Sequence, residues 1–365
     1  MTTYTNKRIG IIFTGGTVAG NVAKSTVSQN VKSDPNSFKV ILENSVDIVK
    51  KNWRVEIFPS ITELLNVDSS NMQPENWTMM IEEIQRTYDD YDAFIILHGT
   101  NTMGYSAAAL TFALENINKP VILTGAQVPL GYLGTDSVTN LVNSLRVAVW
   151  GYHEIKGVMA VFGSKIITGS RVKKGTDFDY DPFKAFQTGE LGNIGRFMRI
   201  NESAMKKHIT YLSKYKALAI QSRVLSVKKN FDTKSIASLT EVPGMSVGLF
   251  QSLVENNGIK AFVFRSFGAG DPSSHLFPAF EYLKKKKIPI VVTTQAPSGV
   301  SNFQVNETGQ YLREHDLAIP AYDMSIESMT VKLAWLLAQK TKYEDIKQKM
   351  VEDMHGEITL ENELI

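Results

Sequence analysis

Several motifs of this sequence combine hydroxyl side chains with glycines, a combination that could support acyl transfer. The first such motif, Thr14-Gly15-Gly16-Thr17, directly follows the apolar run Ile9–Phe13. Two glycines allow a sharp turn that presents backbone amides with no Cβ in the way. A threonine at this point could attack a carbonyl carbon. The same residues would also suit a tight turn in which Thr17 is a helix N-cap, so the motif alone leaves both interpretations open.

Two further motifs follow other apolar runs. His98-Gly99-Thr100-Asn101-Thr102 follows Ala93–Leu97, and Leu123–Pro129 covers the end of the next run. A helix predicted from Gly104 would point its first amide hydrogens at a bound group. For His98 a buried structural role is favoured over catalysis.

A lysine completes this set of groups. One of the two lysines in the stretch Arg171–Thr176, Lys173 or Lys174, could act as a base if burial lowers its pKa, although most loop lysines are solvated. The chain has no cysteine, which excludes disulfides, thiolate metal sites and a cysteine nucleophile. The six histidines are scattered without metal-ligand spacing. Together these features favour threonine-based acyl transfer with no metal and no cofactor.

Alternating strands and helices must position these motifs. Such alternation predicts an α/β fold with a parallel sheet covered on both faces, and ligands then bind at the carboxyl ends of the strands. The expected strands are Arg8–Phe13, Arg54–Phe58, Ala93–Leu97, Val121–Thr124 and Val158–Phe162, and the expected helices are 37–51, 74–88, 104–117 and 138–150.

The alternation restarts near residue 215, which predicts a second domain. The polar segment Asn201–Lys214 is the expected linker, so the predicted domains are 1–205, with the chemical motifs, and 215–365. The expected strands are Leu218–Gln221, Ser246–Leu249, Ala261–Arg265 and Ile288–Thr293, and the expected helices are Phe250–Asn256 (a helix start), Ser274–Lys285 and Ser325–Lys340.

Charge and hydropathy exclude several classes of partner. The 365 residues carry a net charge of +2, so no nucleic-acid partner is expected. No stretch has the roughly 18 apolar residues of a membrane span, and the N-terminus does not have the pattern of a secretory signal. A cytoplasmic location is therefore expected.

The motifs together resemble the bacterial-type L-asparaginases, and the cytosolic type I branch most closely. TGGT at 14–17 and HGTNT at 98–102 match the family signatures TGGT and HGTDT, and the similarity extends over nearly the whole chain, including Asp68–Met72 and Thr294–Gly299. The resemblance implies a larger N-terminal domain with a mainly parallel sheet and a smaller C-terminal α/β domain. It also implies a homodimer or homotetramer that hydrolyses a small-molecule amide.

The resemblance also assigns roles to single residues. It makes Thr14 the nucleophile and Thr100 and Lys174 the second threonine and the lysine of a triad. It places the substrate's α-carboxylate at Ser69 and Ser70, and it places backbone around the substrate amide at Gly99 and Ala126. Asn101 stands at the position of the family aspartate.

Two departures from the family pattern bear on activity. Asn101 keeps the shape of the aspartate and a carbonyl acceptor but removes the charge, so affinity for an α-ammonium should fall about tenfold or more. The loss of that anion should also lower the pKa of Lys174. The family lid normally supplies a tyrosine, whereas no tyrosine lies between Tyr4 and Tyr88, and the expected lid Ala19–Ser33 is polar.

Three functions are therefore carried forward. The first is hydrolysis of L-asparagine to L-aspartate and ammonia through an acyl-threonine. The second is hydrolysis of a related amide that lacks a free α-ammonium, and the third is binding of a small amino acid without hydrolysis. A transamidating subunit of transfer-RNA amidation uses the same fold, but the resemblance there includes an added N-terminal domain, whereas this chain begins at its first strand.

Overall fold

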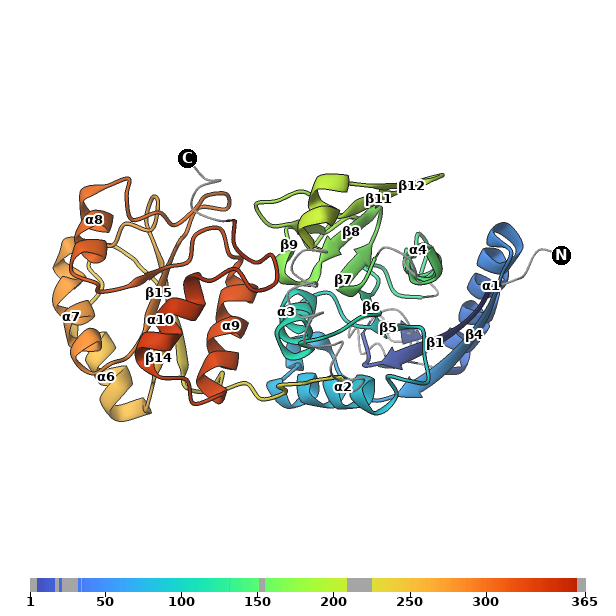
Figure 1. The fold of residues 1–365 in the computed structure, drawn as a ribbon, viewed down its shortest axis with the longest axis horizontal. Helices are drawn as coiled ribbons and strands as arrows, with labels where there is room; N and C mark the ends of the chain where they lie inside the picture. Colours follow the sequence, from blue (N-terminus) through green and yellow to red (C-terminus); the bar gives the residue numbers. More distant parts are fainter. Residues whose placement is uncertain are drawn as a thin grey trace. The chain divides into compact units, whose positions relative to one another are not determined.

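A computed structural model describes residues 5–16, 20–21, 32–33, 35–130, 132–150, 155–208 and 225–359 (Figure 1). The chain divides into two compact units, Met1–Lys229 and Asn230–Ile365. No helix among the described residues is long and apolar enough to cross a lipid bilayer.

The first unit is built on an eight-stranded sheet in the order β12-β11-β8-β7-β6-β5-β1-β4. Its five parallel strands are β4 (Val55–Glu63), β1 (Thr5–Phe13), β5 (Ala93–Leu97), β6 (Pro120–Thr124) and β7 (Gly157–Phe162). An antiparallel extension follows, made of β8 (Lys165–Thr168), β11 (Gly192–Ile194) and β12 (Met198–Ile200). The expected mainly parallel sheet is therefore confirmed, with an antiparallel edge that the sequence pattern did not indicate.

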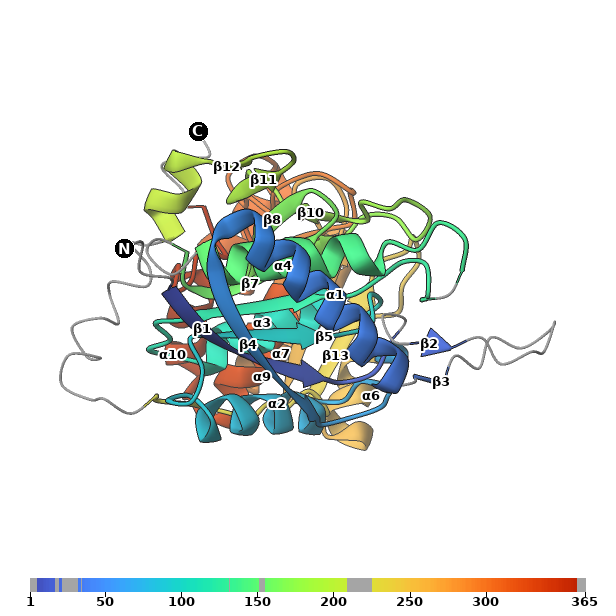
Figure 2. The same ribbon diagram turned by 90° about the vertical axis from the view of Figure 1, so that its right-hand side faces the viewer.

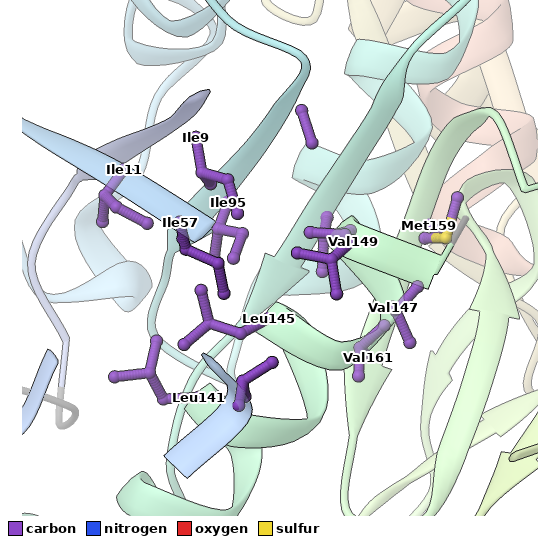
Figure 3. Packing of buried hydrophobic residues seen from close by; sticks show 14 of the residues in the cluster. Ile9, Ile11, Ile57, Ile95, Leu141, Leu145, Val147, Val149, Met159 and Val161 are labelled. Atoms are coloured by element: carbon purple, nitrogen blue, oxygen red, sulfur yellow. The ribbon is translucent and has the colours of Figure 1, made fainter. Parts of the chain in front are cut away.

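Helices cover both faces of this sheet. On one face α1 (Pro35–Trp53) and α4 (Ser137–Trp150) lie against each other and over the strands (Figure 2). Their apolar side chains and those of the strands form a core cluster, and Figure 3 draws part of it, including Leu141 and Leu145 of α4 beside Ile57 and Ile95 of the strands. α3 (Met103–Ala113) packs against β7 and contacts α2 (Pro74–Arg86). Every residue of β5 and β6 is buried, because neither face of these central strands meets water.

Shorter elements complete the first unit around the ends of the strands. A 3₁₀ turn, Ser69–Asn71, follows β4, and a second one, Gly169–Arg171, follows β8. β9 (Val172–Lys174) pairs antiparallel with β10 (Phe183–Ala185), which places Phe183 opposite Lys174. The pair β2 (Gly20–Asn21) and β3 (Lys32–Ser33) lies within the segment expected to be a lid.

The second unit has a four-stranded parallel sheet in the order β13-β14-β15-β16. Phe250, Phe262, Phe264 and Phe280 pack edge to face or tilted in its core. Its strands are β13 (Ile236–Thr240), β14 (Ala261–Ser266), β15 (Ile290–Thr294) and β16 (Ile319–Pro320), and its helices are α6 (Gly248–Asn257), η4 (Ser274–Leu276), α7 (Phe277–Lys285), α8 (Glu307–Glu314), α9 (Ile326–Ala338) and α10 (Tyr343–Val351).

A buried ion pair attaches the C-terminal segment to this unit. Both side chains of the Lys332–Glu357 pair are fully buried, with Nζ 2.6 Å from Oε1. Lys332 Nζ also donates to the carbonyl oxygens of Met350 and Glu352, and Glu357 accepts from the backbone amide of His355. Burial acts to raise the pKa of Glu357, but the charges of Lys332 and His355 and the hydrogen bonds from Lys332 Nζ and the His355 amide outweigh it and hold the pKa at about 2.

Two expectations for the second half of the chain were wrong. Ser246–Leu249 is not a strand, since α6 begins at Gly248, and the sheet position is taken by Ile236–Thr240. The expected linker does not begin at residue 201, because residues 202–208 are helical and Met205 joins the core of the first unit. The expected strand Leu218–Gln221 lies outside the described residues.

Candidate active site

The glycine turn after β1 packs backbone against backbone. Gly15 and Gly16 have φ of +106° and +86°, in the left-handed region that side chains disfavour. A Cβ on Gly15 would lie 2.5 Å from the amide nitrogen of Val67, and one on Gly16 would lie 2.6 Å from that of Gly99. The turn therefore fits between the segments that follow β4 and β5 only because it carries no side chains.

The segment after β5 also packs too closely for a side chain, here against the 3₁₀ turn Ser69–Asn71. A Cβ on Gly99 would approach Ser69 Oγ to 2.5 Å. Ser69 Oγ accepts a hydrogen bond from the Asn101 amide at 3.2 Å, and the Ser69 carbonyl accepts one from Thr102 Oγ1 at 2.7 Å. Gly99 and Ser69, two of the expected substrate-binding residues, are thus in direct contact.

Lys174 joins two neighbouring residues of the HGTNT motif. Its Nζ donates to Thr100 Oγ1 at 2.9 Å and to Asn101 Oδ1 at 3.0 Å. These residues are 74 and 73 positions away in sequence, and the antiparallel pairing of β9 with β10 holds the lysine in place. Burial lowers the pKa of Lys174 from its ordinary value, and the charge of Asp177 opposes this effect.

The other end of the Asn101 carboxamide contacts the second serine of the 3₁₀ turn. Asn101 Nδ2 donates to Ser70 Oγ at 2.9 Å. The backbone amide of Ser70 donates to Asp68 Oδ1 at 2.7 Å, which caps the turn. Ser70 and Asn101 are exposed, so their remaining hydrogen-bonding capacity is open to a ligand.

The position of Thr14 does not fit the expected role of nucleophile. Thr14 is fully buried, its hydroxyl donates to the Leu97 carbonyl at 2.8 Å, and its amide donates to the same oxygen at 3.1 Å. Thr14 therefore continues the pairing of β1 with β5, and its oxygen is not presented to a substrate.

The other hydroxyl of the glycine turn, Thr17, lies outside the described residues. In sequence it follows the two glycines that end the strand pairing. The sequence signal for choosing it is that the first threonine of the motif directly follows the strand residue Phe13, whereas the last one comes after the turn.

His98 has the structural role that was expected. It is fully buried, its Nδ1–H donates to the Gly99 carbonyl at 2.7 Å, and its Nε2 accepts from Ser106 Oγ at 2.8 Å. Ser106 Oγ in turn accepts from Trp77 Nε1 at 3.0 Å. Burial lowers the pKa of His98 to about 4, against a smaller opposing effect of the Gly99 hydrogen bond, so the ring is neutral near pH 7.

Ala126 lies in the segment that follows β6. It is buried, and a Cβ on its neighbour Gly125 would lie 2.4 Å from the His98 carbonyl oxygen, so this segment also packs on the HGTNT motif. The carboxylate of Asp136 accepts hydrogen bonds from the amides of Gln127 and Val128, which fixes the chain just after Ala126.

Most of the expected lid, Ala19–Ser33, lies outside the described residues, apart from the β2–β3 pair. Among the side chains that are described, no three His, Asp or Glu residues cluster as ligands for a metal ion.

Comparison with known proteins identifies the family of the chain. The family profile "Asparaginase, N-terminal" matches residues 8–206, and "Glutaminase/Asparaginase C-terminal domain" matches residues 235–350. L-asparaginase 1 of Escherichia coli is 34% identical over 295 residues, which cover 80% of this chain and 82% of that protein. This chain therefore belongs to the asparaginase family, as its motifs indicated.

Other relatives extend the match to almost the full chain. The crystal structure of L-asparaginase I from Vibrio cholerae superposes with a TM-score of 0.75 at 27% identity, covering 98% of this chain and all of that one. The family also includes components of amidotransferases: one subunit of the glutamyl-tRNA(Gln) amidotransferase of Thermococcus kodakarensis is 28% identical over 96% of this chain and 76% of its own length.

Proposed function

We propose that this chain is a cofactor-free amidohydrolase that releases ammonia from a small primary carboxamide, with L-asparagine as the reference substrate. The observation that carries the proposal is the contact of Lys174 Nζ with Thr100 Oγ1 at 2.9 Å, beside the glycine turn. A lysine whose pKa is lowered by burial can take a proton through a neighbouring hydroxyl, which is what activation of an alcohol requires.

For the nucleophile we propose Thr17 in place of Thr14. The hydroxyl of Thr14 is buried and bonded to the Leu97 carbonyl. Gly16 packs on Gly99, and in the sequence Thr17 follows the first of these glycines and Thr100 the second. This order along the chain supports Thr17 as the group that Thr100 and Lys174 would activate.

The reaction then proceeds in two steps. The threonine oxygen attacks the carboxamide carbon while its proton passes through Thr100 to Lys174. The tetrahedral intermediate collapses, its nitrogen takes the proton from Lys174 through Thr100 and leaves as ammonia, and an acyl-threonine remains. Water, deprotonated by the same couple, attacks the ester and releases the carboxylic acid. Backbone amides of the segment around Thr100 are the expected donors to the oxyanion.

Ammonia release from L-asparagine by purified variants tests this function. We expect Thr17→Val to lower kcat by about 10³-fold or more, as loss of a nucleophile does, and Thr14→Val to lower it far less. Lys174→Met should also abolish turnover, whereas Lys173→Met, on the same strand, is the matched control.

Two outcomes would change the assignment. A folded Thr14→Val variant without activity, beside an active Thr17→Val variant, would restore Thr14 as the nucleophile. If wild-type protein binds aspartate in calorimetry and releases no ammonia from any carboxamide, the chain is an amino-acid-binding member of the family. The cytoplasmic location and assembly as a homodimer or homotetramer stay predictions.

A further inference from the structure

Asn101 connects the proposed base to the proposed binding turn. Its Oδ1 accepts from Lys174 Nζ at 3.0 Å, and its Nδ2 donates to Ser70 Oγ at 2.9 Å. These contacts fix the orientation of the carboxamide, because Lys174 Nζ keeps an N–H to donate to Oδ1 in either protonation state and Ser70 Oγ accepts the hydrogen of Nδ2.

Counting donors and acceptors shows what this pair offers to a ligand. Asn101 Nδ2 has two hydrogens, of which Ser70 takes one. Ser70 Oγ accepts that hydrogen and keeps its own hydroxyl hydrogen to donate. The exposed side of the pair therefore presents two donors, the second Nδ2–H and the Ser70 O–H, and its remaining acceptors, the second lone pairs of Asn101 Oδ1 and Ser70 Oγ, are neutral.

An ammonium group is only a donor, and at this pair only neutral oxygens can accept its hydrogens, whereas a carboxylate oxygen can accept from both donors of the pair. Asp68 Oδ1 accepts from the Ser70 backbone amide, and Asp177 acts on the charge of Lys174. Neither accepts a hydrogen bond from the side chain of Asn101 or Ser70 in the described structure.

We infer that Asn101 and Ser70 select monoamides of dicarboxylic acids that carry no ammonium on the α-carbon, with succinamate as the simplest probe. The inference rests on the proposed amidohydrolase function and names the substrate class of that same site. An aspartate at position 101 would reverse the preference, because its carboxylate could accept from an ammonium. A hydrogen bond to a charged partner exceeds a neutral one by an amount that corresponds to about a tenfold change in affinity.

Binding of the two product acids tests the inference without any turnover. Calorimetry compares succinate with L-aspartate on the wild-type chain and on Asn101→Asp. We expect the wild type to bind succinate more tightly, and the ratio of the two dissociation constants to move about tenfold toward L-aspartate in Asn101→Asp. An unchanged ratio, or a wild type that prefers L-aspartate or binds neither acid, would overturn the inference.

Turnover then separates failure of the inference from failure of the proposed function. Ammonia release is measured from succinamate and L-asparagine with both proteins, after thermal unfolding has shown that Asn101→Asp is folded. A higher kcat/KM for succinamate in the wild type, shifted toward L-asparagine by the substitution, supports the inference. Release from both amides with L-asparagine preferred by the wild type overturns the inference alone, and no release from either amide overturns the proposed function as well.

Discussion

Removing the charge of Glu357 gives the sharpest test of the energetics of this fold. The change Glu357→Gln keeps the size of the side chain but takes away the carboxylate that pairs with Lys332 at 2.6 Å, where both side chains are fully buried. The pKa of Glu357 is held at about 2, compared with an ordinary value of 4.5. One pKa unit corresponds to ~1.4 kcal/mol, so the ionised carboxylate stabilises the folded state by about 3 kcal/mol near neutral pH.

The sign of the pH dependence follows from this depressed pKa. Above pH 4.5 the carboxylate is ionised in both the folded and the unfolded chain, so the stabilisation is complete. As the pH falls from 4.5 toward 2, Glu357 binds a proton in the unfolded chain but not yet in the folded chain, and the stabilisation is lost. At pH 3 about half of it should remain. Gln cannot titrate, so the wild type should lose its advantage over Glu357→Gln in this range.

The assay is urea unfolding of the full chain, wild type against Glu357→Gln, at pH 7 and pH 3. Glu352→Gln is the matched control, since it makes the same chemical change at an exposed side chain in the same segment. We expect a difference in the free energy of unfolding of about 3 kcal/mol at pH 7 and about half that at pH 3. A difference that is the same at both pH values, or no larger than that of the control, would refute the reasoning.

Other predictions concern the candidate site. Gly16→Ala should abolish ammonia release, because its Cβ would meet the backbone of Gly99, whereas Gly244→Ala, at nearly the same φ of +83° but with no neighbour within 4 Å, should keep activity and bear only the backbone strain. Comparable activity of the two variants would contradict the packing argument. Nuclear magnetic resonance titration should find a pKa of about 4 for His98. Since the unfolded ring titrates near 6.5, the folded state should lose about 3 kcal/mol between pH 6.5 and 4, and His98→Gln should remove this dependence.

The sequence was informative where burial is complete. β5 and β6 are continuous apolar runs with both faces covered, and their bounds were predicted to within one residue. Short, half-exposed strands gave no such pattern. Ile236–Thr240 contains serine and threonine among its few apolar residues, and it becomes a strand because β14 offers it a parallel partner.

For the candidate site, the sequence motifs identified residues but not the contacts that depend on long-range packing. Thr100, Lys174, Ser69 and Asn101 were chosen from motifs, and the structure brings them into contact. The burial of Thr14 could not be inferred from its motif, because it depends on Leu97, which is 83 residues away. The contact between Asn101 and Ser70 likewise depends on how two segments pack.

The glycine contacts restrict how this site could be altered. Gly15, Gly16, Gly99 and Gly125 each face neighbouring atoms so closely that even a methyl group would force one of these segments to shift. The backbone segments that carry these glycines therefore have no room for added side-chain atoms. Protein engineers who seek a new substrate would do better to keep these segments unchanged and vary the exposed side chains beside them.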